Sequence, residues 1–327
     1  MEIMYRQEFD RWFKGDKYIR PLLRPVFRKI KPPKVFYYSG MELVVKNFLL
    51  GLQKKNIHYN FNRPHFMIGR HKKIISFGLG MAGLQGLKKG NPIISAIGFP
   101  YPAELPNLCF DYNVKKYLVH SDWALEMNKA ARIYDEKIFG LWPAGINTQQ
   151  WIPGTELGKK ETDVLIYNKI YWETEKVNEE LLFPIKNYLQ SNGYKYTEII
   201  YGKYNPKEYA EKLKRSKVMI FLSAHESQGL AYQECLSSNV PIIAWDQGFW
   251  LDPIRFKYGK PIVKASSVPY FDERCGMKFV DFEEFTKRFM DFFENAMSNK
   301  YNPREYILEN LSIEKSTDKM LEIYNSI

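Results

Sequence analysis

Residues 217–244 read KVMIFLSAHESQGLAYQECLSSNVPIIA, and the interpretation of the whole chain starts from this stretch. A pattern typical of a buried strand, over 217–222, ends in a polar loop that carries Glu226. Gly229 then opens a helical pattern over 229–237 that carries Glu234, and a second apolar strand pattern follows at 241–244. This order of strand, loop, helix and strand predicts one βαβ unit of a parallel sheet.

The start of this helix predicts a phosphate site. The first backbone N–H groups of a helix have no partner within it, so those near Gln228, Gly229 and Leu230 can bind an anion. Glu226 precedes the helix, and Glu234 lies about one and a half turns into it. Both carboxylates can accept charge-assisted hydrogen bonds from hydroxyl groups on either side of a diphosphate. The alternative interpretation is a surface helix with two incidental glutamates.

Similar alternation runs through the rest of the chain. We expect strands at 35–38, 74–77, 92–97, 117–120, 138–142, 163–167, 197–201, 217–222, 241–244 and 261–264. We expect helices at 41–52, 176–190, 206–215, 229–237, 282–297 and 303–310. Nearly continuous apolar strands that alternate with helices are typical of parallel sheets covered on both faces. The predicted fold class is therefore α/β.

A length of 327 residues predicts about two domains. The segment 151–158, WIPGTELG, contains one proline and two glycines and predicts a hinge near residue 155. We therefore expect a first domain at 34–155 and a second at 156–327. Residues 1–33 mix nine basic residues with bulky apolar ones, and four prolines interrupt any long helix. They are interpreted as a basic arm that binds a membrane interface or packs on the first domain.

The positive charge is concentrated in the first half of the chain. Residues 1–155 hold 24 Lys and Arg against 11 Asp and Glu, whereas residues 156–327 hold 24 against 26. Such a field favours an anionic partner, either nucleic acid, an acidic glycan or an anionic membrane, unless it is only a solvated basic surface. Nucleic acid is disfavoured because the basic residues form no recognisable binding module.

Several classes of protein are excluded by composition and spacing. Cys109, Cys235 and Cys275 are widely spaced, which argues against a disulfide framework or a zinc ribbon and favours a reducing compartment. The first twenty residues contain four acidic side chains and no apolar core of a signal peptide, and no apolar run is long enough to span a bilayer. We expect a cytoplasmic protein.

A second glycine motif competes for the function. Gly78, Gly80 and Gly83 form a G-x-G-x-x-G pattern after the strand expected at 74–77. In a dinucleotide-binding domain such glycines allow a pyrophosphate to approach a helix. The acidic residue that should follow about 20 residues later is poorly placed, because Glu104 lies in the proline-rich run 99–106. Close strand–helix packing explains these glycines equally well.

The spacing from Glu226 to Glu234, with seven residues between them, resembles the E-x7-E signature of retaining GT-B glycosyltransferases (glycosyltransferase family 4, also called glycosyl transferases group 1). The flanking sequences are similar to that family as well. Residues 239–244 resemble its G-x-P-V-I-A strand, and residues 201–218 resemble its strand–glycine–helix segment. In the first half, residues 39–42 resemble its G-G-x-E loop, and residues 143–154 resemble its P-N-G-V-D turn.

The resemblance implies a GT-B fold, in which two Rossmann-like parallel-sheet domains face each other across a cleft. The C-terminal domain is expected to be compact, because the strand near residue 199 directly follows its first helix. The resemblance also implies that Glu226 is catalytic and contacts the donor sugar, and that Glu234 binds the ribose. The remaining donor-binding residues that it implies are Gln228, Gly229, Leu230, Lys169, Lys176, Gly40 and Gly202.

The implied reaction moves a sugar from a nucleotide-sugar donor to a glycan or lipid-linked acceptor, in the synthesis of cell-surface polysaccharide or lipopolysaccharide. We expect retention by front-face displacement, because no second carboxylate is evident as a nucleophile. We also expect no cofactor and no metal, since the chain has no Asp-x-Asp motif. The expected location is the cytoplasm, with peripheral attachment to the cytoplasmic membrane face. The alternatives are a sugar-nucleotide epimerase of similar architecture or a Rossmann NAD-dependent oxidoreductase.

Two further features depart from the family pattern. Residues 97–101, IGFPY, lack the histidine that the family often places there. His120 belongs to the following strand and is interpreted as structural, and the role of His225 is open. The polar run 272–276 has no counterpart in the family pattern, so its role is not assigned.

Overall fold

A computed structural model describes residues 1–6, 19, 20, 23, 40–78, 83–96, 111–132, 135–154, 159–260 and 262–327. The chain divides into two units. The first contains Met1–Pro143 and Ser316–Ile327, and the second contains Ala144–Lys315. The division lies at Pro143 rather than near residue 155, and the last twelve residues belong to the first unit. The hinge residues 155–158 lie outside the described residues.

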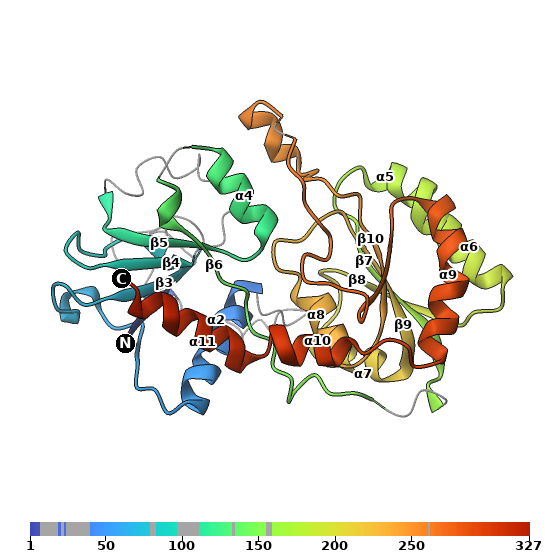
Figure 1. Cartoon of the computed structure of the whole chain (residues 1–327), viewed down its shortest axis with the longest axis horizontal. Coiled ribbons are helices and arrows are strands. Elements are labelled where there is room, and N and C mark those ends of the chain that lie inside the picture. Colours follow the sequence, from blue (N-terminus) through green and yellow to red (C-terminus); the bar gives the residue numbers. More distant parts are fainter. Residues whose placement is uncertain are drawn as a thin grey trace. The chain divides into compact units, whose positions relative to one another are not determined.

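Within its described part, the first unit has a parallel sheet of six strands in the order β2-β1-β3-β4-β5-β6 (Figure 1). The strands are β1 (Glu2–Arg6), β2 (Asn60–Phe61), β3 (Ile74–Gly78), β4 (Ile93–Ala96), β5 (Val114–Val119) and β6 (Phe139–Leu141). The α-helices are α2 (Gly40–Lys54), α4 (Asp122–Ala130) and α11 (Ile313–Asn325), of which the first unit contains the part from Ser316 on. Two short 3-10 helices are η1 (His65–Met67) and η4 (Glu136–Ile138).

The expectation of a separate arm at residues 1–33 is wrong for its first residues. Glu2–Arg6 form β1 and pair with both β2 and β3, so they lie inside the first sheet. Glu2, Ile3 and Met4 are buried, and this burial stabilises a strand at that position. The strand expected at 35–38 and most of the arm lie outside the described residues.

The glycine motif at Gly78 has a structural role in the first unit. Gly78 has φ +148°, and a Cβ atom there would lie 1.8 Å from the carbonyl oxygen of Arg6 in the adjacent strand. Only glycine therefore permits β1 and β3 to approach at this point. Gly80 lies outside the described residues.

Within the residues described for it, the second unit has a parallel sheet of five strands in the order β11-β10-β9-β7-β8. They are β7 (Thr162–Lys169), β8 (Tyr196–Ile200), β9 (Ser216–Ser223), β10 (Ile242–Trp245) and β11 (Gly276–Phe279). Numbered along this unit the order is 2-1-3-4-5, one of the common doubly wound orders, which reverses direction between β7 and β9. The expected α/β class with Rossmann-like parallel sheets is confirmed in both units.

Helices cover both faces of the second sheet. One face packs against α7 (Pro206–Arg215), α8 (Leu230–Ser237) and α10 (Pro303–Asn310), through a core that includes Tyr209, Tyr232 and Ile307. The other packs against α6 (Phe183–Ser191) and the phenylalanine-rich α9 (Phe282–Met297). A short α5 (Thr174–Val177) and a π-helical turn (Asn178–Leu182) lead into α6. Buried strands with helices on both faces explain the continuous apolar runs of the sequence.

One expected strand of the second unit is wrong. Residues 262–264 form no strand of the sheet. Lys264 instead makes an isolated antiparallel bridge with Phe249. The fifth strand is β11 instead, paired in parallel with β10. Its sequence, GMKF, contains a charged residue and so gives a weak strand signal.

Candidate functional site

The sheet order of the second unit places a candidate site at the carboxyl ends of β7 and β9. Ligands of doubly wound sheets bind where the strand order reverses, outside the carboxyl ends of the strands. Lys169 is the last residue of β7, Ser223 is the last residue of β9, and Glu226 follows in the next loop. Residues far apart in the sequence therefore meet at this edge.

Lys169 and Glu226 form a short ion pair at this edge. Lys169 Nζ lies 2.6 Å from Glu226 Oε1, and the two side chains are only 18% and 10% exposed. Ser223 Oγ donates to the same oxygen at 3.0 Å. Lys169 Nζ also lies 4.6 Å from the centre of the Tyr201 ring, within the range of a cation–π interaction. Such burial makes the pair costly to break by removing one partner.

The backbone fixes the loop that carries Glu226. The amide of Glu226 donates to the carbonyl of Ser266 at 2.9 Å. Gly229 has φ +77°, and a Cβ atom there would lie 2.1 Å from Cε1 of the buried Tyr232 ring. Glycine is therefore required for the chain to turn from the loop into α8. This turn leaves the first N–H groups of α8 available at the carboxyl edge of the sheet.

His225 is held beside Glu226 in a neutral form. Its ring stacks on Trp172, with ring centres 4.8 Å apart and planes inclined by 23°. Burial lowers the pKa of His225 to about 4, and the positive charges of Lys169 and Arg255 act in the same direction. At neutral pH the imidazole is therefore uncharged and adds no positive charge to the site.

Glu234 lies in α8 and is only 7% exposed. Burial raises the pKa of its carboxyl group to about 8, although a hydrogen bond from Trp151 acts in the opposite direction. The carbonyl of Trp151 accepts hydrogen bonds from Ser237 Oγ and Arg304 Nη1, both at 2.8 Å. The side chain of Arg304 thus fixes the residue that contacts Glu234.

A buried tyrosine relates the two glutamates in space. Tyr167, in β7, shares a 2.7 Å hydrogen bond with the hydroxyl of Tyr204. Burial is the largest cause of the raised pKa of Tyr167, Tyr204 contributes further, and the negative charges of Glu226 and Glu234 also contribute. Both carboxyl groups therefore lie within electrostatic range of one hydroxyl group.

The other residues expected at the site lie in different environments. Gln228 supports the fold: its Oε1 accepts from the amide of Ala144 at 2.8 Å and its Nε2 donates to Gln233 at 2.8 Å. Leu230 is the first residue of α8. Lys176 is exposed and lies 3.9 Å from Glu173, so it is not part of the Lys169–Glu226 pair.

The two remaining expected residues are glycines, one in each unit. Gly202, with φ +82°, forms an exposed turn after β8. Gly40 begins α2 in the first unit. A contact of either glycine with the donor stays a prediction.

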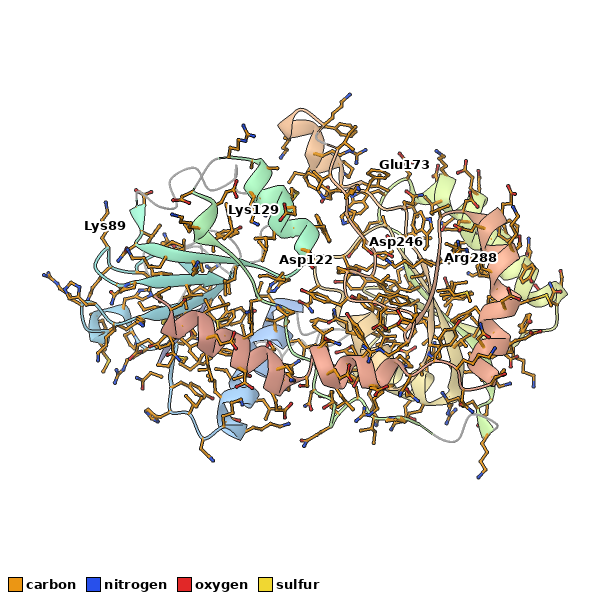
Figure 2. The ribbon with its side chains drawn as sticks, in the orientation of Figure 1. Lys89, Asp122, Lys129, Glu173, Asp246 and Arg288 are labelled. Atoms are coloured by element: carbon orange, nitrogen blue, oxygen red, sulfur yellow. The ribbon has the colours of Figure 1, made fainter. Side chains whose placement is uncertain are left out.

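Asp246 and Ser266 are site residues that sequence reasoning did not select. Asp246, next to the carboxyl end of β10, is labelled in Figure 2; its Oδ2 accepts from Ser266 Oγ at 2.7 Å and pairs with Lys278 at 2.8 Å. Asp246 Oδ1 accepts from the amide of Ser267 at 3.0 Å. Because the carbonyl of Ser266 binds the amide of Glu226, this network supports the loop. In the sequence, the signal for this network is Asp246 itself, an aspartate directly after the apolar strand β10.

A cavity of about 290 Å³ lies beside Lys169, between the ends of β7 and β8. The rings of Tyr171 and Tyr201 stand edge to face there, with centres 5.6 Å apart. Its lining consists of Asn168, Lys169, Ile170, Tyr171, Thr174, Asn178, Ile200, Tyr201 and Lys203. Two half-exposed aromatic rings, amide groups and two lysines make this cavity suitable for a planar, polar ligand group.

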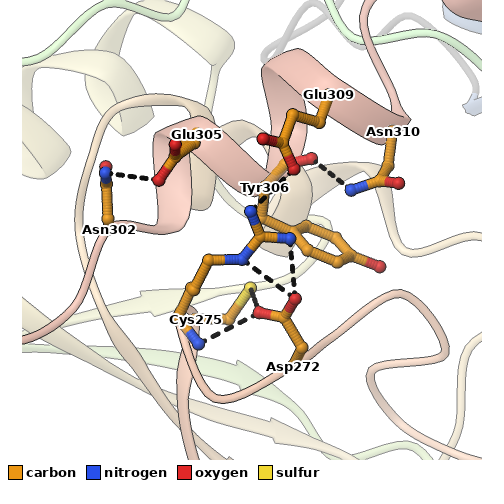
Figure 3. A network of polar contacts seen from close by, with 8 residues as sticks. Asp272, Cys275, Asn302, Glu305, Tyr306, Glu309 and Asn310 are labelled. Carbon is orange, nitrogen blue, oxygen red and sulfur yellow. Dashed lines mark hydrogen bonds and ion pairs between the residues drawn. The ribbon is translucent and has the colours of Figure 1, made fainter.

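The polar run 272–276 is a structural turn (Figure 3). Arg274 binds Asp272 Oδ2 through two nitrogens, at 3.0 and 2.8 Å, and Glu309 of α10 at 2.7 Å. Its guanidinium also lies 5.3 Å from the centre of the Tyr306 ring. The turn therefore holds α10 beside the start of β11.

His120 is buried, and its Nδ1 lies 3.0 Å from the carbonyl of Trp142, consistent with a structural role.

Among the described residues, no group of three or more His, Cys, Asp or Glu side chains is arranged to hold a metal ion. In the same part of the chain, no helix is both long and apolar enough to cross a membrane.

No protein-family model and no curated protein matches the sequence, whereas the fold is similar to that of several solved structures. WaaB, described as a lipopolysaccharide outer core galactosyltransferase, has a TM-score of 0.52 at 12% identity, over 100% of both chains. WaaG, described as a glycosyltransferase involved in lipopolysaccharide biosynthesis, has a TM-score of 0.54 at 10% identity, over 99% of both chains. This likeness establishes the shared two-domain fold.

A third similar structure is a variant of TarM from S. aureus in complex with fondaparinux, α-GlcNAc-glycerol and UDP. Its TM-score is 0.54 at 12% identity, over 77% of this chain and 55% of TarM. The present chain therefore spans about half the length of that protein.

Proposed function

We propose that this protein is a glycosyltransferase that takes its sugar from a nucleotide-sugar donor bound in the second unit. The observation that carries the proposal is the Lys169–Glu226 pair at the switch point of the sheet, beside the start of α8. A cation and open helix amides suit a diphosphate, and a carboxylate suits sugar hydroxyls. The similar folds of WaaB, WaaG and TarM support this assignment.

In the proposed reaction, the bond between the anomeric carbon and the donor diphosphate breaks, and its electron pair moves to the diphosphate. Lys169 and the amides of Gly229 and Leu230 stabilise this growing negative charge. Glu226 holds the donor sugar, and Glu234 holds the ribose. The acceptor hydroxyl attacks from the same face and passes its proton to the departing phosphate oxygen, which retains the anomeric configuration. No metal is required in this scheme.

The cavity beside Lys169 extends the proposal to the base of the donor. A nucleobase can stack on Tyr171 or Tyr201 and form hydrogen bonds with the neighbouring amides, while the diphosphate reaches Lys169. Nothing in the composition of this cavity selects one base. UDP is a reasonable first probe, because the TarM variant is described in complex with UDP.

We further propose a glycan or lipid-linked acceptor, in cell-surface polysaccharide or lipopolysaccharide synthesis at the cytoplasmic membrane face. Two of the similar proteins are described as acting in lipopolysaccharide synthesis. The excess positive charge on the first half of the chain also favours an anionic surface. Incubation with nucleotide sugars and candidate acceptors, followed by product analysis, tests this part of the proposal.

A calorimetric titration with UDP tests the donor site. We expect Lys169→Gln to weaken UDP binding about tenfold or more, as expected for a lost hydrogen bond to a charged group. Lys287→Gln is the matched control, since that exposed lysine lies in α9, where it pairs with Glu283, and does not line the cavity. The double variant Lys169→Gln/Glu226→Gln avoids a buried unpaired carboxylate and should bind equally weakly. Wild-type affinity in both Lys169 variants would refute the proposed phosphate contact.

A further inference from the structure

The chain makes a long excursion from the second sheet between β10 and β11. Its neck is antiparallel: the amide of Trp250 donates to the carbonyl of Val263 at 2.9 Å, and the amide of Ala265 to that of Gly248 at 3.0 Å. Trp250 is 2% exposed and anchors the neck in the unit. Beyond the neck, the short helix η7 (Pro253–Tyr258) forms the outer part, drawn in orange at the top of Figure 1.

The outer part of this excursion exposes large apolar side chains. Phe256 is 53% exposed and Ile262 is 89% exposed, and Phe249 at the neck is 46% exposed. An isolated exposed apolar side chain is ordinary, but three on one excursion need an explanation. The fold itself does not require them there, because the hydrophobic cores of the second unit are built from other residues.

Positive charge surrounds these apolar groups. Residues 249–264 contain Arg255, Lys257, Lys260 and Lys264 against one acid, Asp252. Asp252 is used within the excursion, since its Oδ1 accepts from the amide of Ile254 at 2.9 Å as the cap of η7. Arg255 and Lys260 lie 4.8 and 5.2 Å from the centre of the Phe256 ring. This net positive charge contrasts with the slightly negative second half as a whole.

We infer that Phe256, Lys257, Lys260 and Ile262, here called the tip patch, dock the protein on an anionic lipid bilayer. Lysines attract the negatively charged headgroups, while exposed aromatic and aliphatic side chains enter the boundary between headgroups and acyl chains. The charge complementarity favours an anionic over a zwitterionic surface. The inference rests on the membrane attachment proposed above and deepens it by naming the docking surface; it is independent of the donor site, because bilayer binding needs no donor and no acceptor.

The excursion also lies close to the candidate site. Burial is the main cause of the lowered pKa of His225, and the positive charge of Arg255 is among the further causes. Arg255 therefore lies within electrostatic range of the loop that carries Glu226. Docking through the tip patch would bring the carboxyl edge of the second sheet near the bilayer surface.

Sedimentation of the full chain with phosphatidylcholine vesicles, with and without phosphatidylglycerol, tests the inference. We expect preferential binding to the anionic vesicles. Lys257→Gln/Lys260→Gln should lower that binding about thirtyfold at low salt, since each lysine near the surface contributes about 1 kcal/mol. Phe256→Ser/Ile262→Ser should lower it about tenfold or more, because both side chains lose burial in the interface.

Matched controls remove similar groups elsewhere on the second unit. Lys207→Gln/Lys300→Gln removes two exposed lysines, and Met290→Ser/Leu308→Ser removes two exposed apolar side chains, which are 54% and 44% exposed. Both controls should bind vesicles like the wild type. The inference is refuted by equal binding to both vesicle types, by tip-patch variants that bind like the controls, or by binding only to a soluble anionic glycan. UDP titration of the same variants keeps this outcome separate from the proposed function, since donor binding should be unchanged.

Discussion

The carboxyl group of Glu234 lies in α8, where water hardly reaches it, and burial raises its pKa to about 8. The group therefore holds a proton in the folded protein at neutral pH. An unfolded chain would release that proton near the ordinary value for glutamate. Folding and ionisation of this one side chain are consequently coupled.

This coupling predicts how stability changes with pH. Below the unfolded pKa both states are protonated and Glu234 contributes no pH dependence. As the pH rises from about 4.5 to about 8, only the unfolded state loses the proton, so this group lowers stability by up to about 4 kcal/mol. Glu234→Gln should lose less stability over the same range. Urea unfolding of both proteins at pH 5, 6, 7 and 8 measures the difference, and parallel profiles would contradict the raised pKa.

For Glu226 we expect the effect of a substitution on turnover to differ from its effect on UDP binding. If it holds the donor sugar, Glu226→Gln should lower turnover far more than it weakens binding of UDP, which lacks the sugar. The amide can keep the contact with Ser223 but loses the charge that pairs with Lys169. Initial rates and UDP titrations on one preparation give both quantities. Turnover near that of the wild type would remove Glu226 from the proposed mechanism.

At the scale of the element, α8 is unusual because it is buried on all sides rather than amphipathic. Tyr232 through Ser237 are all buried, and Gly229, directly before the helix, has the left-handed conformation. A short, buried helix can present its first amides at the edge of the sheet only if the preceding loop turns tightly. Gly229 makes this turn possible, since any side chain there meets the ring of Tyr232.

Gly229→Ala should therefore lower stability by about 2–4 kcal/mol, through overpacking against a buried ring together with backbone strain. Gly202→Ala is the matched control: its φ of +82° is similar, but no atom lies within 4 Å of the added Cβ. The control should cost only about 1 kcal/mol. Thermal unfolding compares the two. Similar losses in both variants would show that the contact with Tyr232 does not matter.

At the scale of the whole molecule, the first unit is built from both ends of the chain. Glu2–Arg6 lie in its sheet, and Ser316–Ile327 return to it through α11. The indole of Trp142 donates to the carbonyl of Ser316 at 2.9 Å, and Lys55 pairs with Asp318 at 2.8 Å. Met320 is completely buried. The stability of this unit thus depends on residues more than 170 positions beyond its last strand.

A truncation after Lys315 should destabilise the first unit more than the second, because it removes buried Met320 and the partners of Trp142 and Lys55. Hydrogen exchange at the amides of β3 should become faster, while exchange in β9 should change little. Removing only Ser326 and Ile327 provides the control. Equal acceleration in both strands would contradict the assignment of α11 to the first unit.

The sequence by itself determined the local structure of the second unit. The bounds of α7, α9 and α10 agree with the expected ranges, because α7 and α10 begin with a proline and the side chain of Asp281 caps the start of α9. β9 and β10 were also predicted, since fully buried parallel strands appear as continuous apolar runs. The spacing of Glu226 and Glu234 around Gly229 indicated the candidate site, because these three residues are neighbours along the chain.

The tertiary structure alone decided which distant segments meet. Nothing local to residues 2–6 or 316–327 shows that both belong to one unit, and the weak strand pattern of β11 left the fifth strand misplaced at 261–264. The pairing of Lys169 with Glu226, and the support of their loop by Ser266 and Asp246, depends on strand order. Strand order is set by the packing of the whole sheet, which residue spacing along the chain does not encode.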